Sequence, residues 1–134
     1  FLTASYIYIN LETKELLHSR CGHLPLIIFG KYDTVARTST PPGKIIGWIP
    51  ELDLEFDRIP LQSGDRIFLY TDGFTEAISP TKQMLDDERW MQIVKNSMRF
   101  DLPGAKKQIL EELKSFTGGL PPEDDMTLVM LEID

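Results

Sequence analysis

The spacing of apolar residues changes twice along this chain, and that change restricts the folds that it can adopt. Over the first 70 residues, apolar residues alternate with polar ones or form short runs, as strands do. Between residues 86 and 117 they recur at helical spacing in two segments, and a last strand-like segment covers residues 126–133. The order of strands, two helices and one strand predicts an α+β fold, with the last strand inserted among the earlier ones.

Turn residues separate the segments that we expect to form strands. In chain order the expected strands are Ser5–Asn10, Glu15–Arg20, Pro25–Phe29, Leu52–Ile59, Arg66–Tyr70 and Met126–Ile133. The first two form a hairpin, and the polar region 31–42 is expected to be a loop. Arg66–Tyr70 is continuously apolar after its arginine, which is typical of a strand that is buried on both faces.

Both helical segments carry signals for their ends. Asp86 or Asp87 can cap the first helix, and a helix N-terminus explains the acidic run Asp86–Glu88 better than a metal site does. The second helix follows Pro103, and Gly118 with Gly119 ends it.

Composition limits the class of protein. The 134 residues suit one compact domain, and no segment resembles a membrane span or a signal peptide. The net charge is −7, from 21 acidic and 14 basic residues, so nucleic acid and anionic lipid are poor partners. Cys21 is the only cysteine, which excludes an internal disulfide and a cysteine-cluster metal site and fits a cytoplasmic location.

Two acidic sites share an unusual context. Asp72 follows the apolar strand that ends at Tyr70, and Asp124 and Asp125 directly precede the last strand. If the two strands are neighbours, these carboxylates converge, repel one another and favour a hard divalent ion such as Mg²⁺ or Mn²⁺. An ion of this kind acidifies a bound water. The plain alternative is that Asp72 is a turn residue and Asp124 a strand-entry residue.

Four segments, in order, resemble the metal-dependent protein phosphatases of the protein phosphatase 2C-like fold, in the bacterial branch typified by SpoIIE and RsbU. Gly64–Ala77, with the sequence GDRIFLYTDGFTEA, resembles a signature of that family. Cys21–Ile28 is similar to its Ala-Gly-His-x-Pro segment, Pro42–Glu51 to its Gly-x-x-Leu-Gly turn, and Asp124–Ile133 to its closing Asp-Asp-x-Thr strand. Together they span nearly the whole chain.

The resemblance implies a partial protein phosphatase 2C-like β-sandwich with two helices after the main strands and a closing C-terminal strand. It also implies two Mg²⁺ or Mn²⁺ ions and hydrolysis of phosphoserine or phosphothreonine on a regulatory protein, such as an anti-sigma-factor antagonist, in signal transduction or a stress response. By position, Asp72 and Asp124 match catalytic metal ligands, and Asp125 is a weaker candidate. Gly73 would let the backbone turn tightly beside the metal.

The family's first metal aspartates and an early helix have no counterpart in this sequence. We therefore expect residues 1–134 to be the C-terminal portion of a single SpoIIE/RsbU-like phosphatase domain, missing its N-terminal strands and first helix. Such a piece would bind at most one divalent ion weakly and hydrolyse little, and its exposed strand edges would invite pairing with a second copy. The alternative function is a non-catalytic phosphatase-like module that binds a partner in a signalling relay.

Four other residues attract attention. We expect His23 to make a structural hydrogen bond at a strand bend rather than to act in acid–base chemistry. His18 is expected at the surface, and Cys21 is expected to pack as a small apolar group. For Trp48 the pattern is compatible with either the core or a partner surface.

Overall fold

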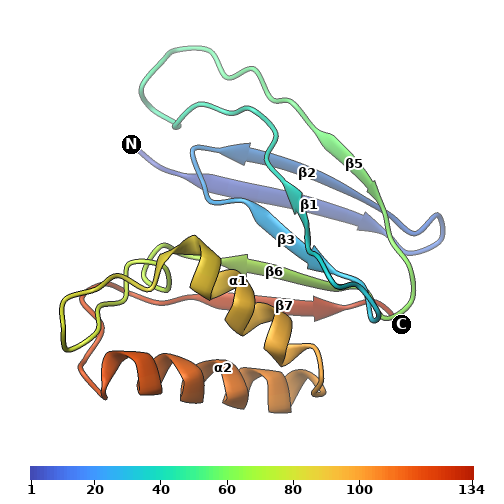
Figure 1. The fold of residues 1–134 in the computed structure, drawn as a ribbon. Helices are drawn as coiled ribbons and strands as arrows, with labels where there is room; N and C mark the ends of the chain where they lie inside the picture. Colours follow the sequence, from blue (N-terminus) through green and yellow to red (C-terminus); the bar gives the residue numbers. More distant parts are fainter.

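The computed structural model describes all 134 residues and shows two antiparallel sheets packed face to face, with two helices on the outer face of the second sheet (Figure 1). The first sheet has the strand order β1-β2-β5 and the second the order β4-β3-β6-β7. The elements are β1 (Ala4–Asn10), β2 (Glu15–Cys21), β3 (Leu26–Phe29), β4 (Arg37–Ser39), β5 (Asp57–Pro60), β6 (Arg66–Tyr70), α1 (Asp86–Ser97), α2 (Leu102–Thr117) and β7 (Leu128–Glu132). The α+β class and the order of elements are confirmed.

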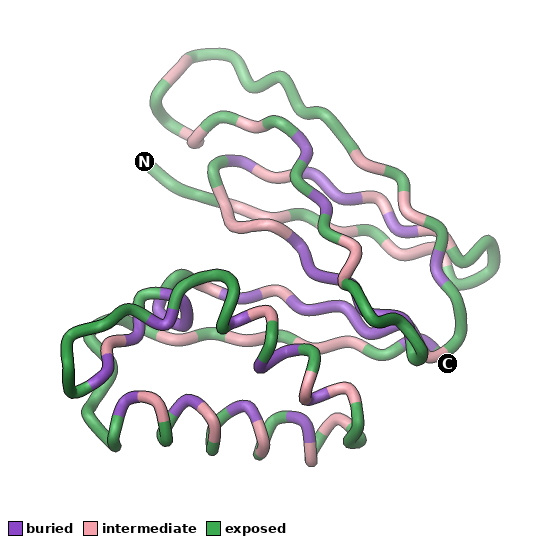
Figure 2. Tube along the Cα trace, in the orientation of Figure 1, coloured by how far each residue is buried: buried purple, intermediate pink, exposed green.

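Strand β6 is buried on both faces, as its apolar run predicts. Ile67 belongs to the apolar cluster between the sheets, together with Leu16 of β2. Phe68 and Tyr70 point to the other side, into a larger cluster that the helices complete with Trp90 and other residues. Figure 2 shows buried residues along β3, β6 and the inward sides of both helices. The turn that contains Asp72 therefore directly follows β6, which with its neighbour β3 forms the most buried strand pair of the fold.

Two strand predictions differ from the structure. Of the predicted segment Leu52–Ile59, only residues 57–59 form a strand: they belong to β5 (Asp57–Pro60), which pairs with β2, and residues 52–56 are exposed outside the sheets. Alternation fits any extended segment with one apolar side, so it cannot report whether a partner strand exists. The predicted loop 31–42 contains the short strand β4. This strand has only three residues, too few for an alternating pattern to be recognised in the sequence.

The last strand is not inserted among the earlier ones, contrary to our prediction. β7 pairs antiparallel with β6, from Arg66 opposite Glu132 to Tyr70 opposite Leu128, and lies at the edge of its sheet. β3 already occupies the other side of β6, so β7 has only one neighbour. The prediction was wrong because an apolar strand pattern does not distinguish an edge position beneath helices from a central one.

Both helices lie where they were predicted, although α2 begins at Leu102, before Pro103, rather than after it. The Asp86 carboxylate accepts a hydrogen bond from the backbone N–H of Arg89 at 3.0 Å, and the Asp101 carboxylate accepts from Gly104 at 2.8 Å. Gly118 ends α2 in the left-handed conformation, with φ of 62°. Neither helix has the length and apolar character that crossing a membrane requires.

His18 is fully buried between the sheets, so its predicted surface position was wrong. Its Nδ1 lies 2.6 Å from Ser39 Oγ on β4, and its Nε2 lies 3.1 Å from Ser5 Oγ on β1. Ser39 donates to the Asp57 carboxylate at 2.7 Å, so its oxygen accepts from His18 and the hydrogen of the neutral ring sits on Nδ1. Residues in alternation on β2 point to opposite faces, and His18 takes the inward face.

Burial lowers the pKa of His18, a shift that nearby Asp57 partly opposes. As the pH falls, the unfolded chain therefore binds a proton at His18 at a higher pH than the folded chain does. The free energy of unfolding is thus not reduced by this residue above pH 6.5, and it falls as the pH drops below that value. We expect the free energy of unfolding to decline with a slope of up to about 1.4 kcal/mol per pH unit in this range. Urea unfolding between pH 7.5 and 5.5 measures the slope. His18→Gln should flatten it, and an unchanged slope in that variant would assign the pH dependence to other groups.

Candidate metal centre

The structure brings the two predicted acidic turns to the same end of one strand pair. β6 ends at Tyr70 directly opposite Leu128, where β7 begins. Because the strands are antiparallel, the segment that leaves β6 and the segment that enters β7 lie at one edge of the sheet. Asp72 follows by two residues on one side, and Asp124 and Asp125 precede β7 on the other.

Thr71 ties the two turns together. Its backbone N–H donates to the carbonyl of Thr127 at 3.1 Å. Its hydroxyl accepts from the Thr127 N–H at 3.0 Å and donates to the carbonyl of Asp125 at 3.2 Å. Three hydrogen bonds thus fix the backbone before Asp72 against the backbone that carries Asp125. Sequence reasoning did not single out Thr71, although its place directly before the Asp-Gly pair was a usable signal.

Gly73 is required by close packing rather than by a turn. Its φ is not in the left-handed region, but a Cβ at this position would lie 2.5 Å from the carbonyl oxygen of Asp125. The contact shows that the loop after β6 presses directly on the loop before β7. Position 73 therefore needs a glycine for packing, and the place of Gly73 beside a metal stays a prediction.

The three carboxylates are exposed, and none forms an ion pair with a lysine or arginine. One oxygen of Asp124 accepts the N–H of Asp125 at 2.7 Å, which fixes the direction of that side chain. The backbone carbonyl of Asp72 accepts from Glu76 at 2.8 Å, closing the turn beneath it. The remaining carboxylate oxygens face solvent and are available to a ligand.

Their chemistry suits a hard divalent ion, because carboxylate oxygens are the donors that Mg²⁺ and Mn²⁺ prefer. The set is nevertheless incomplete, since no three His, Cys, Asp or Glu side chains of the chain come together in a group that could hold a metal ion. Residues 1–134 thus fit part of such a site and not all of it.

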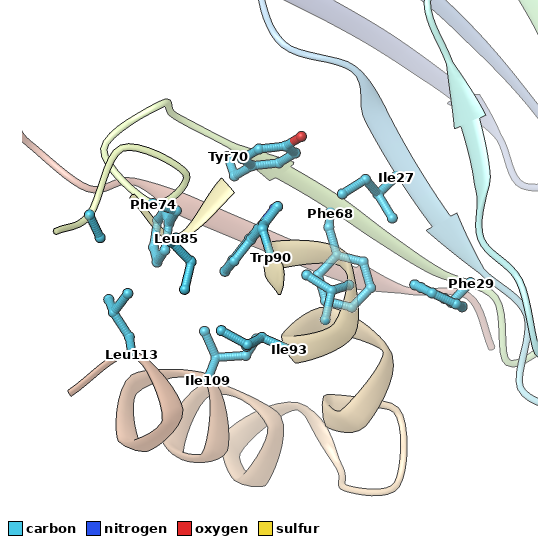
Figure 3. Close-up of a cluster of buried hydrophobic side chains, with 12 residues drawn as sticks. Ile27, Phe29, Phe68, Tyr70, Phe74, Leu85, Trp90, Ile93, Ile109 and Leu113 are labelled. Atoms are coloured by element: carbon cyan, nitrogen blue, oxygen red, sulfur yellow. The ribbon is translucent and has the colours of Figure 1, made fainter. Parts of the chain in front are cut away.

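An aromatic cluster supports the turn from inside. The ring of Trp90 on α1 lies 5.2 Å from Tyr70 and 4.7 Å from Phe74, centroid to centroid (Figure 3). Phe74 follows Asp72 and Gly73, so packing of α1 sets the path of this loop. Burial, with a contribution from Asp87, raises the pKa of Tyr70 to about 12, which keeps its hydroxyl protonated at neutral pH. The Tyr70 ring packs in the core beside Trp90.

A cavity of about 450 Å³ lies at the opposite end of β6. Its buried carboxylate, Asp65, already accepts from Arg37 at 2.6 Å and from the N–H of Gln62 at 2.9 Å. Because these charges are paired within the fold, the cavity is a weaker functional candidate than the acidic turns.

The other predicted residues have structural positions. The carbonyl of His23 accepts from Arg20 at 2.8 Å and its ring lies 3.4 Å from the Thr3 hydroxyl, which confirms a structural role at the bend after β2. Cys21 is buried, as predicted. Trp48 is exposed, and its ring meets that of Phe1 edge-on at 6.1 Å.

Several known proteins are similar to this chain over nearly its whole length. The family model described as Stage II sporulation protein E (SpoIIE) matches residues 1–134. The chain is 27% identical over 133 residues to Protein IcfG of Synechocystis sp., covering 96% of this chain and 20% of that protein. It is 24% identical over 132 residues to Phosphoserine phosphatase RsbU of Bacillus subtilis, covering 98% of this chain and 38% of that protein.

The fold also matches a solved structure. The SiaA-PP2C domain of Pseudomonas aeruginosa superposes with a TM-score of 0.85 at 18% identity, over 98% of this chain and 51% of that one. The chain thus spans well under half the length of these two curated relatives and about half of the solved domain. With the model match over every residue and the shared fold, this chain belongs to the SpoIIE family of protein phosphatase 2C-like domains and is homologous to the phosphatase domains of RsbU and SpoIIE.

Proposed function

We propose that residues 1–134 form the C-terminal portion of a SpoIIE/RsbU-like phosphatase domain whose N-terminal strands and first helix come from outside these residues. The intact domain would hydrolyse phosphoserine or phosphothreonine on a regulatory protein. One observation carries the proposal: Thr71 joins two acidic turns at one edge of the sheet through hydrogen bonds to residues 125 and 127, which lie 54 and 56 residues further along the chain. Family membership over the whole chain supports it.

In this proposal Asp72 and Asp124 are ligands of Mg²⁺ or Mn²⁺, and Asp125 helps to position Asp124. A bound ion of this kind neutralises charge on the phosphoryl group and acidifies water. Thr71 and Gly73 fix the separation of the two turns, and the hydrogen bond from Asp125 orients the Asp124 carboxylate. The remaining carboxylates would come from outside residues 1–134, because these residues gather no group of three.

The substrate class that we propose is a phosphorylated regulatory protein such as an anti-sigma-factor antagonist, in the cytoplasm. Two relatives support this class: one named phosphoserine phosphatase RsbU, and one solved structure that holds RsbU and RsbW domains together. The second candidate is a non-catalytic phosphatase-like module that binds a partner in a signalling relay; it applies if the segments outside residues 1–134 supply no further carboxylates to the two acidic turns.

Phosphate release from a phosphoserine peptide by the full-length protein tests the proposal and separates the two candidates. We expect hydrolysis with Mn²⁺, loss of hydrolysis to background with a chelator, and recovery when excess Mn²⁺ is added. A phosphotyrosine peptide serves as the control for substrate class. Binding of the phosphoserine peptide without phosphate release would support the non-catalytic module. A rate of hydrolysis that the chelator does not change would contradict the metal site.

A further inference from the structure

The segment that follows Asp72 is held against the start of α1 by backbone hydrogen bonds. The N–H of Leu85 donates to the carbonyl of Ala77 at 2.8 Å, and the N–H of Asp86 donates to the carbonyl of Thr75 at 3.1 Å. The chain thus doubles back on itself between these residues. The first residue of α1 therefore lies beside the turn that carries Asp72, although 14 residues separate the two in the sequence.

Thr75 connects this backbone pairing to Asp72. Its hydroxyl donates to the Asp72 carbonyl at 3.2 Å, and the N–H of Glu76 donates to the same carbonyl at 2.8 Å. Thr75 is buried, so water competes little for these bonds. The backbone of Asp72 is therefore fixed relative to Thr75, and the carbonyl of Thr75 is fixed relative to Asp86.

Asp86 has a backbone conformation that most residues avoid. Its φ is 65°, in the left-handed region, where a Cβ is unfavourable and which glycine adopts freely. Aspartate tolerates this region better than most residues do, because its short side chain can hydrogen-bond to nearby backbone. The Asp86 carboxylate makes such a bond with the N–H of Arg89, at 3.0 Å. In this conformation one residue caps α1 and also donates its own N–H to Thr75.

Side chains hold the same two segments together. Phe74 and Leu85, one from each segment, are both buried in the cluster that contains Trp90 (Figure 3). The Trp90 ring, one helical turn after Asp86, lies 4.7 Å from the Phe74 ring. Because a closely packed interior transmits displacements rather than absorbing them, a shift at the start of α1 would move the turn that carries Asp72.

We propose that Asp86 is a positioning residue for the metal centre: its left-handed backbone sets the start of α1 against Thr75 and thereby sets the place of Asp72. This role rests on the proposed function, in which Asp72 binds the ion. Coupling between two parts of a protein is reciprocal. An ion at Asp72 should therefore stabilise the start of α1, and a change at the start of α1 should change the affinity for the ion.

Asp86→Gly and Asp86→Ala in the full-length protein provide the test. Both variants remove the carboxylate, its negative charge and its bond to Arg89, and they differ by one methyl group. Glycine retains the left-handed backbone without strain, whereas alanine disfavours it. In calorimetric titration, Asp86→Ala should raise the dissociation constant for Mn²⁺ at least about fivefold relative to Asp86→Gly. Both proteins should fold, since Asp86 is exposed.

Hydrogen exchange gives a second readout, which needs no metal. Asp86→Ala should speed exchange at the amides of Glu76 and Leu85, which donate to the carbonyls of Asp72 and Ala77, more than Asp86→Gly does. In the unaltered protein, addition of Mn²⁺ should slow exchange at the same two amides. Faster exchange at Glu76 in the alanine variant alone would support the role of the left-handed backbone.

Asp101→Ala controls for the loss of a helix cap. Asp101 caps α2 by accepting from the N–H of Gly104 at 2.8 Å, but its φ is −64°, so alanine there removes a cap and a charge without backbone strain. Its Mn²⁺ affinity should match that of the unaltered protein, even where its urea unfolding shifts as far as that of Asp86→Ala.

Equal Mn²⁺ affinities of the glycine and alanine variants at position 86 would overturn the proposal, and so would an equal loss of affinity in Asp101→Ala. An unaltered protein that binds no Mn²⁺ would count against the proposed function instead. In that case the exchange rates at Glu76 would still decide whether the backbone of Asp86 holds the turn.

Discussion

In the intact phosphatase domain, Asp72→Ala is expected to lower the rate of phosphoserine-peptide hydrolysis on the order of 100-fold, equivalent to about 2.7 kcal/mol of transition-state stabilisation. The reason is that Asp72, in the proposed site, binds the metal ion directly, and the site has few carboxylates. Asp72 is exposed and its side chain makes no hydrogen bond or ion pair within the chain, so the fold should tolerate its removal. The loss of rate is then a loss of chemistry rather than of structure.

Glu111→Ala is a suitable control, because it also removes one exposed negative charge but lies on α2, in a helical pair with Lys107. Its rate should match that of the unaltered protein. Both variants should unfold at the same urea concentration as the parent. An Asp72→Ala protein that retained its activity would exclude this residue as a ligand.

Trp90→Ala is expected to destabilise the chain by about 3–5 kcal/mol, a large part of the stability of a domain of this size. Trp90 is 1% exposed and fills the space between α1, β6 and the loop that carries Phe74. Its indole N–H has no hydrogen-bond partner, so the loss comes from packing alone. The cavity would also remove the packing that holds the loop after β6. Hydrogen exchange, or a fluorescent probe on that loop, should therefore detect opening of the loop before global unfolding.

Trp48→Ala provides the control for that variant, since Trp48 is 68% exposed and contacts only the Phe1 ring among the aromatic residues. We expect it to cost about 1 kcal/mol or less in urea unfolding. If the Trp90→Ala protein does not unfold in a single cooperative transition, Trp90→Phe replaces it in the comparison. This variant keeps most of the side-chain volume and should give a smaller, measurable loss of stability. Equal costs at positions 48 and 90 would contradict the packing described for α1.

The fold was readable from the sequence where a local pattern and a tertiary position agree. The apolar residues of Arg66–Tyr70 predict a strand that is buried on both faces, and the helices and the first sheet do cover its two faces. Gly118 predicts the end of α2 because it adopts the left-handed backbone conformation there. Patterns fail where the partner decides the outcome. Residues 52–56 alternate like a strand but pair with no other strand, and β7 is apolar although it lies at the edge of its sheet.

The candidate site divides in the same way. Asp72, Asp124 and Gly73 stood out through residue type and position beside strands. The Thr71 bridge and the contact of Gly73 with Asp125 depend on which strands are neighbours, and no spacing in the chain reports that. His18 was misjudged for a related reason: its burial depends on Ser39 of β4, in the other sheet, and on Asp57, which begins β5 opposite His18 and is distant in the sequence.

A double-mutant cycle on Asp72 and Asp124 in the intact domain most directly tests whether the two turns hold one divalent ion. Mn²⁺-dependent hydrolysis of a phosphoserine peptide would be compared for Asp72→Ala, Asp124→Ala and the combined variant. If both carboxylates bind the same ion, the first loss already empties the site, and the combined variant should be only slightly slower than either single one. Losses that multiply in the combined variant would show that the two aspartates act independently, and would contradict a shared metal site.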